Sequence, residues 1–295
     1  MQLAHMSYLE MSLDTNNVDL KAWVGRKRTE RDIVEPRQAR GMAALLDRDP
    51  EQYSAGTVLP EFWHWIYFNP AVPRSRLGED GHELRGDFFP PVELPRRMWA
   101  GGRLQFLRPM VIGEEIERVS EILSIEQKHG RSGDLVLVTV RYVISDKTGA
   151  CVEEEQDIVY CEIPKSPSSP QPQAALPDDL EWRDTFLPDA VVLFRYSALM
   201  FNAHRIHYDY PFTTEVEGYR GLIVHGPLTA TLLLDAAKRK VAGTLTSFEY
   251  RGIAPLFNDE PITLAGRRSA AGQDTELWAA GPSGAIAMQG RVTWA

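Results

Sequence analysis

Hydrophobic and polar residues alternate along two similar stretches of the chain, residues 102–122 and 247–267. Each stretch contains an alternating run, a proline (Pro109 or Pro255), an acidic turn and a second alternating run. A period of two residues places successive side chains on opposite faces of a strand. Each stretch therefore predicts two strands joined by a turn.

Further alternating runs follow each of these stretches. Residues 134–144 and 151–163 flank the turn SDKTGA, and residues 275–280 and 285–294 flank the turn GPSG. Gly, Asp, Ser and Pro between two alternating runs are typical of β-hairpins. We therefore expect an antiparallel meander at the end of each half, and we interpret the similarity of the halves as an internal duplication.

Segments with helical composition precede each meander. Residues 36–46 and 194–202 occupy corresponding places in the two halves, and residues 225–241 predict a longer helix in the second half. In the first half its place is taken by residues 59–98, rich in Trp, Pro, Gly and Arg, with one short aromatic helix expected at 61–68. The chain is thus predicted to be α+β, with a central helix retained in the second half and degraded in the first.

The helix expected over residues 225–241 has clear end signals and a wide apolar face. Pro227 stands near its first turn, and Lys238, Arg239 and Lys240 fill its last turn, which suits the helix dipole. Its leucines and alanines form an apolar face that predicts burial against the sheet.

A segment dense in proline, serine and glutamine, residues 164–177, separates the two halves. Such composition favours an extended linker over a helix or strand. The first residues carry acids and polar side chains without an apolar core, which is unlike a signal peptide. We predict a flexible tail, a first domain that forms a binding wall without its own active site, a linker, and a catalytic second domain, over residues 1–20, 21–163, 164–180 and 181–295.

Composition excludes several classes of function. The net charge of −9 and the lack of a Lys/Arg-rich run argue against a nucleic-acid partner. The chain has no run of 18 apolar residues, so we expect no membrane span. Cys151 and Cys161 form neither a disulfide framework nor a zinc motif, and we predict a cytoplasmic protein.

Polar residues concentrate in FNAHRIHYD, residues 201–209, which contains Asn202, His204 and His207. The segment GLIVHGPL, residues 221–228, follows and leads into the long helix. Histidine exchanges protons near neutral pH, and free N–H groups at a helix start can stabilise a developing oxyanion. The pattern predicts an acid–base site, although a structural histidine and a simple helix cap also fit it, while the HxxH spacing is a poor metal signal.

The segments FRYSALMFNAHRIHYD and EGYRGLIVHGPLTATLLL resemble those of MaoC-like hydratases and dehydratases with a double hot-dog fold. DGHELRGDFFPPVELPRRMWAGGRLQF resembles the N-terminal half of the same group. The resemblance implies two curved antiparallel sheets, a thioester tunnel between them, and interconversion of 2-enoyl-CoA and 3-hydroxyacyl-CoA by a hydro-lyase. Within this group the chain is most similar to dehydratases of 3-hydroxyacyl thioesters and to mesaconyl-CoA and itaconyl-CoA hydratases, which implies a short, branched dicarboxylic acyl group.

The resemblance also implies roles for individual residues. In the family motif an Asp and a His activate one water molecule; the His matches His207, but Asn202 stands where the Asp is expected. An amide can orient water but cannot accept a proton, so His207 becomes the principal acid/base, with Asp209 or Glu217 as possible assisting carboxylates. Gly226 matches the glycine beside the thioester oxygen. The predicted site comprises catalytic His207 and Asn202, and His225, Gly226, Tyr196 and Arg251 as substrate-binding residues.

Other expectations concern the first half and the partners. An alignment of the two halves places Gln52 opposite His207 and Asp47 opposite Asn202, so the first half lacks the essential imidazole. Arginines beside the motifs and others beside the first-half sheet, Arg96 and Arg97 among the latter, are expected either to form surface ion pairs or to bind CoA phosphates and a substrate carboxylate. His64, His82 and His129 receive no role. We expect no metal, no cofactor beyond the CoA of the substrate, and a homodimer, because hot-dog sheet edges are commonly covered by pairing.

Two other functions remain open on the same fold. A thioesterase would need a carboxylate base on the central helix, where only Asp235 is available, late in the helix. A non-catalytic acyl-CoA-binding subunit would explain the loss of the motif Asp.

Overall fold

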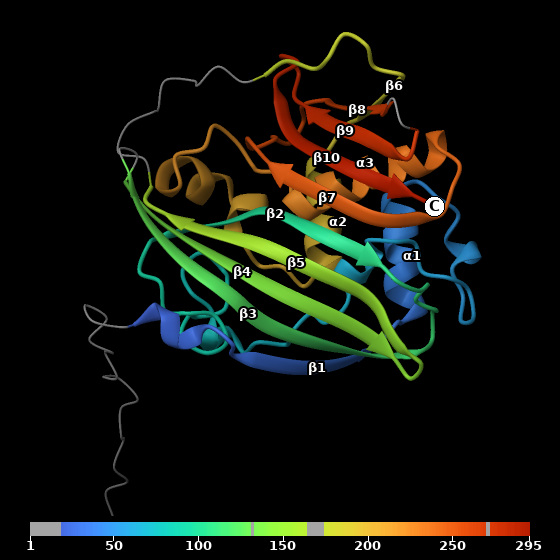
Figure 1. The fold of residues 1–295 in the computed structure, drawn as a ribbon. Coiled ribbons are helices and arrows are strands. Elements are labelled where there is room, and N and C mark those ends of the chain that lie inside the picture. Colours follow the sequence, from blue (N-terminus) through green and yellow to red (C-terminus); the bar gives the residue numbers. More distant parts are fainter. Residues whose placement is uncertain (1–18, 131–132, 164–173, 270–271) are drawn as a thin grey trace, which may run out of the picture.

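The computed structural model describes residues 19–130, 133–163, 174–269 and 272–295, and two similar series of elements follow one another along it (Figure 1). In the first half, β1 (Lys27–Ile33) and α1 (Pro36–Leu45) precede a long irregular segment and the strands β2 (Arg96–Phe106), β3 (Glu115–Gly130), β4 (Gly133–Asp146) and β5 (Gly149–Cys161). In the second, β6 (Trp182–Phe186), α2 (Ala190–Leu199) and α3 (Gly226–Lys240) precede β7 (Leu245–Gly252), β8 (Ile262–Arg268), β9 (Asp274–Ala280) and β10 (Ile286–Trp294).

The strands form one antiparallel sheet of ten, in the order β1-β3-β4-β5-β2-β7-β10-β9-β8-β6. This order is symmetric about the β2–β7 pair, where Gly102 lies opposite Tyr250 and Leu104 opposite Phe248. The predicted meanders and the duplication are therefore present, and the two hot-dog sheets are joined edge to edge into one. The outer edges of the joined sheet are β1 and β6, and the homodimer expected from such edges stays a prediction.

The long helix α3 lies against the inner face of the second-half strands, as its apolar face predicts. It contacts β7, β8, β9 and β10, and every residue from Leu228 to Ala237 is buried. Figure 1 shows α3 behind these strands, and it shows loops and short helical turns behind the strands of the first half. There the only regular element within the expected 61–68 segment is the short 3-10 helix η4 (Trp63–Ile66). The central helix is thus retained in one half and degraded in the other.

The predicted domain limits stay a prediction, because both expected boundaries fall largely on residues that the structure does not describe. Residues 1–18 of the expected tail and 164–173 of the expected linker lie outside the described residues. Asp19 caps the 3-10 helix η2 (Leu20–Trp23), and the N–H of Leu176 bonds to the carbonyl of Gly284 in the turn before β10. None of the helices that the structure describes is long and apolar enough to span a membrane.

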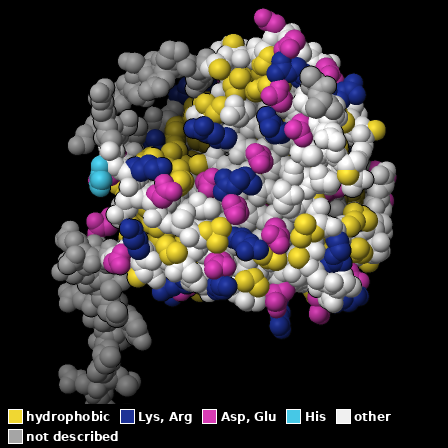
Figure 2. All heavy atoms as spheres, in the orientation of Figure 1, with side chains coloured by type: hydrophobic (Ala, Val, Ile, Leu, Met, Phe, Trp, Pro, Cys, Tyr) yellow, Lys and Arg dark blue, Asp and Glu magenta, His cyan; other side chains and the backbone are white. Residues whose placement is uncertain are grey.

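Positive and negative side chains are interleaved on the outer face of the sheet, as Figure 2 shows. On neighbouring strands β2 and β5, Arg103 forms ion pairs with Glu155 and Asp157. Such a mixed surface differs from the one-signed patch that binds nucleic acid.

Candidate active site

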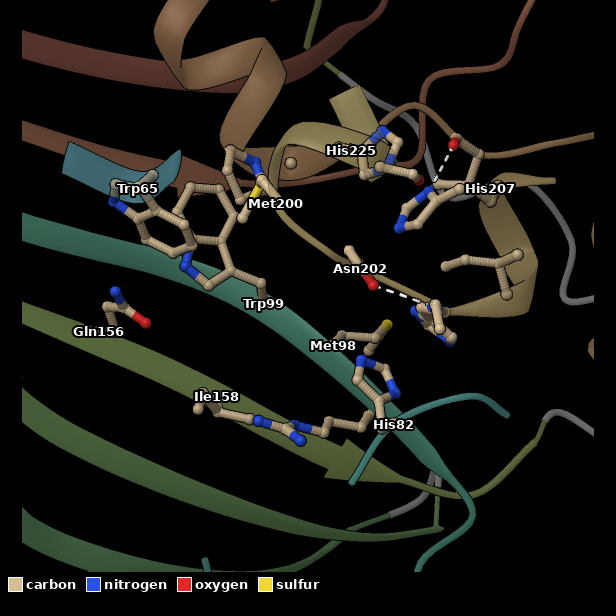
Figure 3. Close-up of a pocket in the computed structure, with 18 of the residues that line it drawn as sticks. Trp65, His82, Met98, Trp99, Gln156, Ile158, Met200, Asn202, His207 and His225 are labelled. Atoms are coloured by element: carbon tan, nitrogen blue, oxygen red, sulfur yellow. Dashed lines mark hydrogen bonds between the residues drawn. The ribbon is translucent and has the colours of Figure 1, made fainter. Parts of the chain in front are cut away.

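A cavity of about 1110 Å³ lies between the two halves and collects most of the residues that the sequence singled out. From the second half, Asn202, His207, His225 and Gly226 line it. Strands β2 and β5 and the irregular segment of the first half supply the rest of its wall, including Trp65, Trp99 and Gln156 (Figure 3). The volume suits an extended small molecule.

His207 is held as a neutral base. It ends the 3-10 helix η6 (Arg205–His207), and its Nδ1 lies 2.8 Å from the carbonyl oxygen of Ile223. Because a carbonyl only accepts, Nδ1 carries the hydrogen and Nε2 keeps its lone pair. Burial lowers the pKa of His207 to about 4, against the smaller opposite effect of this hydrogen bond. His207 is therefore uncharged at neutral pH and ready to accept a proton.

His225 supports His207 and begins α3. Its ring stacks on that of His207, with centroids 3.6 Å apart and planes 19° from parallel. Its Nε2 shares a hydrogen bond of 2.8 Å with Ser197 Oγ, and burial holds its pKa well below the ordinary value. The stacking and the nearby positive end of α3 both disfavour a charged imidazole here.

The start of α3 provides N–H groups next to these imidazoles. The first N–H groups of a helix have no partner within it, so those at Gly226 and Leu228 are available at its positive end. A Cβ on Gly226 would lie 2.5 Å from Trp99 Cε3, so only glycine lets this ring pack against the helix start.

Asn202 lies in the cavity but can only orient a ligand. Its Oδ1 accepts the backbone N–H of His204 at 2.9 Å, which leaves the amide N–H groups directed to other partners. Figure 3 shows its side chain in the space between His207 and His82. Asn202 thus offers no base in place of the motif carboxylate.

His82, to which the sequence assigned no role, is brought into the cavity by the first half. Its ring centroid is 4.0 Å from that of His204, and its Nδ1 is 2.9 Å from Asp80 Oδ2. Burial, opposed by the bond to Asp80, lowers the pKa of His82. The residue stands in DGHELRG, within the stretch that resembles the family, but its neighbours in space are more than a hundred positions away in the sequence.

His64 also lines the cavity and likewise lacked an assignment. Its Nε2 is 2.8 Å from the buried carboxylate of Glu154, which also accepts from Trp65 Nε1 at 3.1 Å and from Tyr250 OH at 3.2 Å. This satisfied network joins β5 to β7 and fixes one wall of the cavity. Its members come from three separate segments, residues 64–65, β5 and β7, so no local pattern could identify it.

Two residues predicted to bind substrate do not line the cavity. Tyr196 is fully buried on α2, where its ring packs against His225 at 4.9 Å. It therefore supports His225 from behind. Arg251 lies on β7 between the inward-facing Tyr250 and Gly252, and strand alternation directs its side chain to the exposed outer face.

The two carboxylates expected to assist are both engaged. Asp209 Oδ2 pairs with Arg205 Nη2 at 2.7 Å and lies outside the cavity lining. Glu217 lines the cavity, but its Oε2 lies 3.2 Å from Arg96 Nε. Neither is free to replace the motif Asp.

Among the arginines in the cavity wall, Arg97 differs from its neighbours. Arg96 pairs with Glu217 and Arg118 with Glu30. Within the described part of the chain Arg97 has no carboxylate partner; it lies 4.5 Å over the ring of Phe89, and its charge contributes to lowering the pKa of His204, chiefly lowered by burial. It is an uncompensated cation near the imidazoles.

Asp80, His82 and His204 are also the one set in the described residues with spacing for a metal, with ligand atoms within 4.8 Å. Asp80 and His82 already bond to each other, and the positive charge of Arg97 acts on both imidazoles. This environment suits a hydrogen-bonded acid–base pair better than a cation.

The comparisons with known proteins agree with this geometry. Residues 62–258 match the family model described as hydroxyacyl-thioester dehydratase type 2. This chain belongs to that family. It is therefore an acyl-thioester hydratase or dehydratase, a hydro-lyase, as the resemblance implied.

Individual relatives and structures support the family assignment. A mesaconyl-C(4)-CoA hydratase of Chloroflexus aurantiacus is 44% identical over 94% of this chain and 98% of its own. A mitochondrial hydroxyacyl-thioester dehydratase type 2 of Schizosaccharomyces pombe is 29% identical over 70% of this chain and 77% of its own. A MaoC-like dehydratase of Phytophthora capsici has the same fold, with a TM-score of 0.71 and 14% identity over 94% of this chain and 98% of that one. The MaoC-like, double hot-dog fold expected from the sequence is thus confirmed.

Proposed function

We propose that this family member hydrates a short dicarboxylic 2-enoyl-CoA of the mesaconyl-CoA type, reversibly, in the cavity centred on His207. The neutral His207 with a free Nε2 is the observation that carries the chemistry. The 44% identical mesaconyl-C(4)-CoA hydratase supports the choice of acyl group. In this proposal CoA is part of the substrate, and no separate cofactor takes part.

Each residue of the cluster has one task in the reaction. His207 Nε2 removes a proton from water as the oxygen adds to the β-carbon of the enoyl group. The electron pair of the double bond moves toward the thioester oxygen, and the imidazolium then returns its proton to the α-carbon. Asn202 positions the water through its amide N–H groups. After turnover His207 is neutral again, so water has been added without another reagent.

The start of α3 stabilises the negative charge that develops on the thioester oxygen. The N–H of Gly226 lies at the positive end of the helix, beside His225 and His207. Donors fixed in a buried site need no reorganisation when the charge appears, which makes this a large contribution to rate.

Arg97 supports a carboxylate on the acyl group. It lines the cavity without an acid partner in the described residues, and a guanidinium is well suited to bind a carboxylate through paired hydrogen bonds. The phosphates of CoA are a whole pantetheine arm away from the thioester, so they do not compete for a cation at this place.

The test is to mix the protein with mesaconyl-CoA, itaconyl-CoA and crotonyl-CoA and follow enoyl absorbance and free thiol together. Loss of enoyl absorbance without thiol release, fastest for mesaconyl-CoA, is the expected result. Faster hydration of crotonyl-CoA would contradict the proposal of a dicarboxylic acyl group. No reaction with any of the three thioesters would favour a non-catalytic binding subunit.

The structure offers a thioesterase little support. Asp235, the only acid on α3, forms ion pairs with Arg48 and Arg239 and does not line the cavity. Release of thiol in the assay above would nevertheless reassign the protein to the hydrolases.

A further inference from the structure

A loop of the first half is docked tightly onto the catalytic loop of the second. The N–H of Arg205 donates to the carbonyl of Asp80 at 2.9 Å, and Arg205 Nη1 donates to the carbonyl of Glu79 at 3.1 Å. Gly81 has a φ of +89°, and a Cβ there would lie 1.9 Å from the carbonyl oxygen of Ala203. The position of this loop is therefore set by backbone contacts that only glycine permits.

The docked loop presents an ordered imidazole to the cavity. Asp80 accepts twice from His82, with Oδ1 bonded to the backbone N–H at 3.0 Å and Oδ2 to ring Nδ1 at 2.9 Å. The carboxylate holds Nδ1 protonated, which leaves a lone pair on Nε2. His204 lies between His82 and His207, with ring centroids 4.0 and 5.4 Å from theirs, but in the described structure no residue hydrogen-bonds to its ring nitrogens.

The site needs a second acceptor for water. A water molecule that donates one hydrogen bond to His207 Nε2 has a second hydrogen that needs an acceptor. Asn202 is not a base, and its Oδ1 already accepts the N–H of His204. Asp209 and Glu217 are paired with arginines. His82 Nε2 is an imidazole acceptor in the cavity wall, and the bond from Nδ1 to the Asp80 carboxylate fixes its orientation.

We propose that His82, oriented by Asp80, is the second catalytic base of this site and binds the attacking water together with His207. The two imidazoles accept the two hydrogens of one water molecule. One imidazole takes a proton as the oxygen bonds to the β-carbon and the π electrons move toward the thioester oxygen. That proton then goes to the α-carbon, so both imidazoles end neutral and one water has been added. In the reverse direction the same groups remove the α-proton and release water.

This proposal depends on hydration chemistry, which the family assignment gives, and does not depend on the dicarboxylic acyl group. The experiment measures kcat and KM of His82→Gln and Asp80→Asn with both mesaconyl-CoA and crotonyl-CoA. In His82→Gln we expect kcat to fall about a hundredfold with KM nearly unchanged, the scale of one acid–base group. In Asp80→Asn the amide donates to Nδ1 and moves the ring hydrogen to Nε2, so kcat falls while the fold is preserved.

A matched control is available on the surface. His129 Nδ1 lies 2.8 Å from Asp134 Oδ1 in an exposed pair outside the cavity, and His129→Gln should leave kcat unchanged. Added imidazole should restore part of the activity of His82→Ala, a rescue that a purely structural role would not allow. Thermal unfolding of each variant identifies any loss of fold.

The outcomes separate the two proposals. If the wild-type protein hydrates crotonyl-CoA but not mesaconyl-CoA, the dicarboxylic acyl group proposed above is wrong. The role of His82 can then still be tested with crotonyl-CoA. Full activity in folded His82→Gln overturns the role of His82, as does a loss confined to His204→Gln. Inactivation by a chelator and recovery with zinc would also overturn it, in favour of a metal on the same residues.

Discussion

The two halves of the molecule share one series of elements but differ at the places where chemistry is done. In the second half, α2 leads into η6, which ends at His207; in the first, α1 leads into the 3-10 helix η3 (Pro50–Gln52), which ends at the exposed Gln52. The alignment of Gln52 with His207 is therefore supported by structure. The two halves thus share a frame, and the histidine that we propose as catalytic base occurs at this position in the second half alone.

The first half contributes to the site by another route. Its segment between α1 and β2, which has no central helix, runs through the cavity wall and carries His64 and His82, and β2 adds Arg97. Loss of a helix in one copy thus gave room for a loop that enters the site of the other copy. The comparison shows that the half without a long central helix still supplies part of the wall of the cavity that contains His207.

The strongest test of the comparison replaces each of the two matched residues, His207 and Gln52, by alanine. His207→Ala should reduce kcat/KM for hydration about a thousandfold, because the proton acceptor is lost. Gln52→Ala should leave it unchanged, because Gln52 lies outside the cavity. Equal effects of the two substitutions on folded protein would mean that both halves are catalytic.

Acid should destabilise the second half through its neutral histidines. The pKa of His207 is lowered to about 4 by burial, while in the unfolded chain it is near 6.5, so the unfolded state binds the extra proton between these values. The free energy of unfolding should therefore fall by about 3 kcal/mol for this residue as pH drops from about 6.5 to about 4. Denaturant titrations at both pH values measure it, and His207→Gln should show a flatter dependence.

The docking of one half on the other can be tested with two glycines of the same backbone conformation. Gly81 and Gly56 have φ values of +89° and +88°. A Cβ added at Gly81 would clash with the carbonyl oxygen of Ala203, whereas one added at Gly56 would have no atom within 4 Å. Each Gly→Ala costs about 1 kcal/mol for the left-handed backbone. Gly81→Ala should cost about 2 kcal/mol more through overpacking and should also lower kcat. Similar stabilities and rates for the two variants would show that the docked loop is not essential.

The smallest effect concerns two arginines on the adjoining strands of the two halves. Arg97→Met should reduce kcat/KM for mesaconyl-CoA about tenfold to a hundredfold and spare crotonyl-CoA, since one charge-assisted contact to a carboxylate is lost. Arg251→Met should change neither, because its side chain is exposed on the outer face of β7. A uniform loss across both substrates in Arg97→Met would assign this residue to CoA or to folding.

Much of the fold followed from local pattern. The helix expected at 225–241 appears at Gly226–Lys240, and that expected at 36–46 appears at Pro36–Leu45. The helix expected at 194–202 begins earlier, at Ala190, because Asp189 caps it through the N–H of Val192. These elements depend on caps, periodicity and turns within a few residues, which the sequence displays directly.

The candidate site was predicted in part. His207, Asn202, His225 and Gly226 lie in two short segments and meet in the cavity as expected. Tyr196 was placed near the site, but whether it faces ligand or core depends on the rotation of α2 against its neighbours. A local motif contains residue types and spacing, while the direction of a side chain depends on packing.

The sequence by itself determined the strands, the helices and the duplication, because these arise from neighbours along the chain. The tertiary structure decided the joining of the two sheets at β2 and β7, the neutral state of the buried imidazoles, and the placing of His82, Arg97 and His207 in the wall of one cavity. These features arise from contacts between distant segments, where burial and orientation set the charge and the role of each side chain.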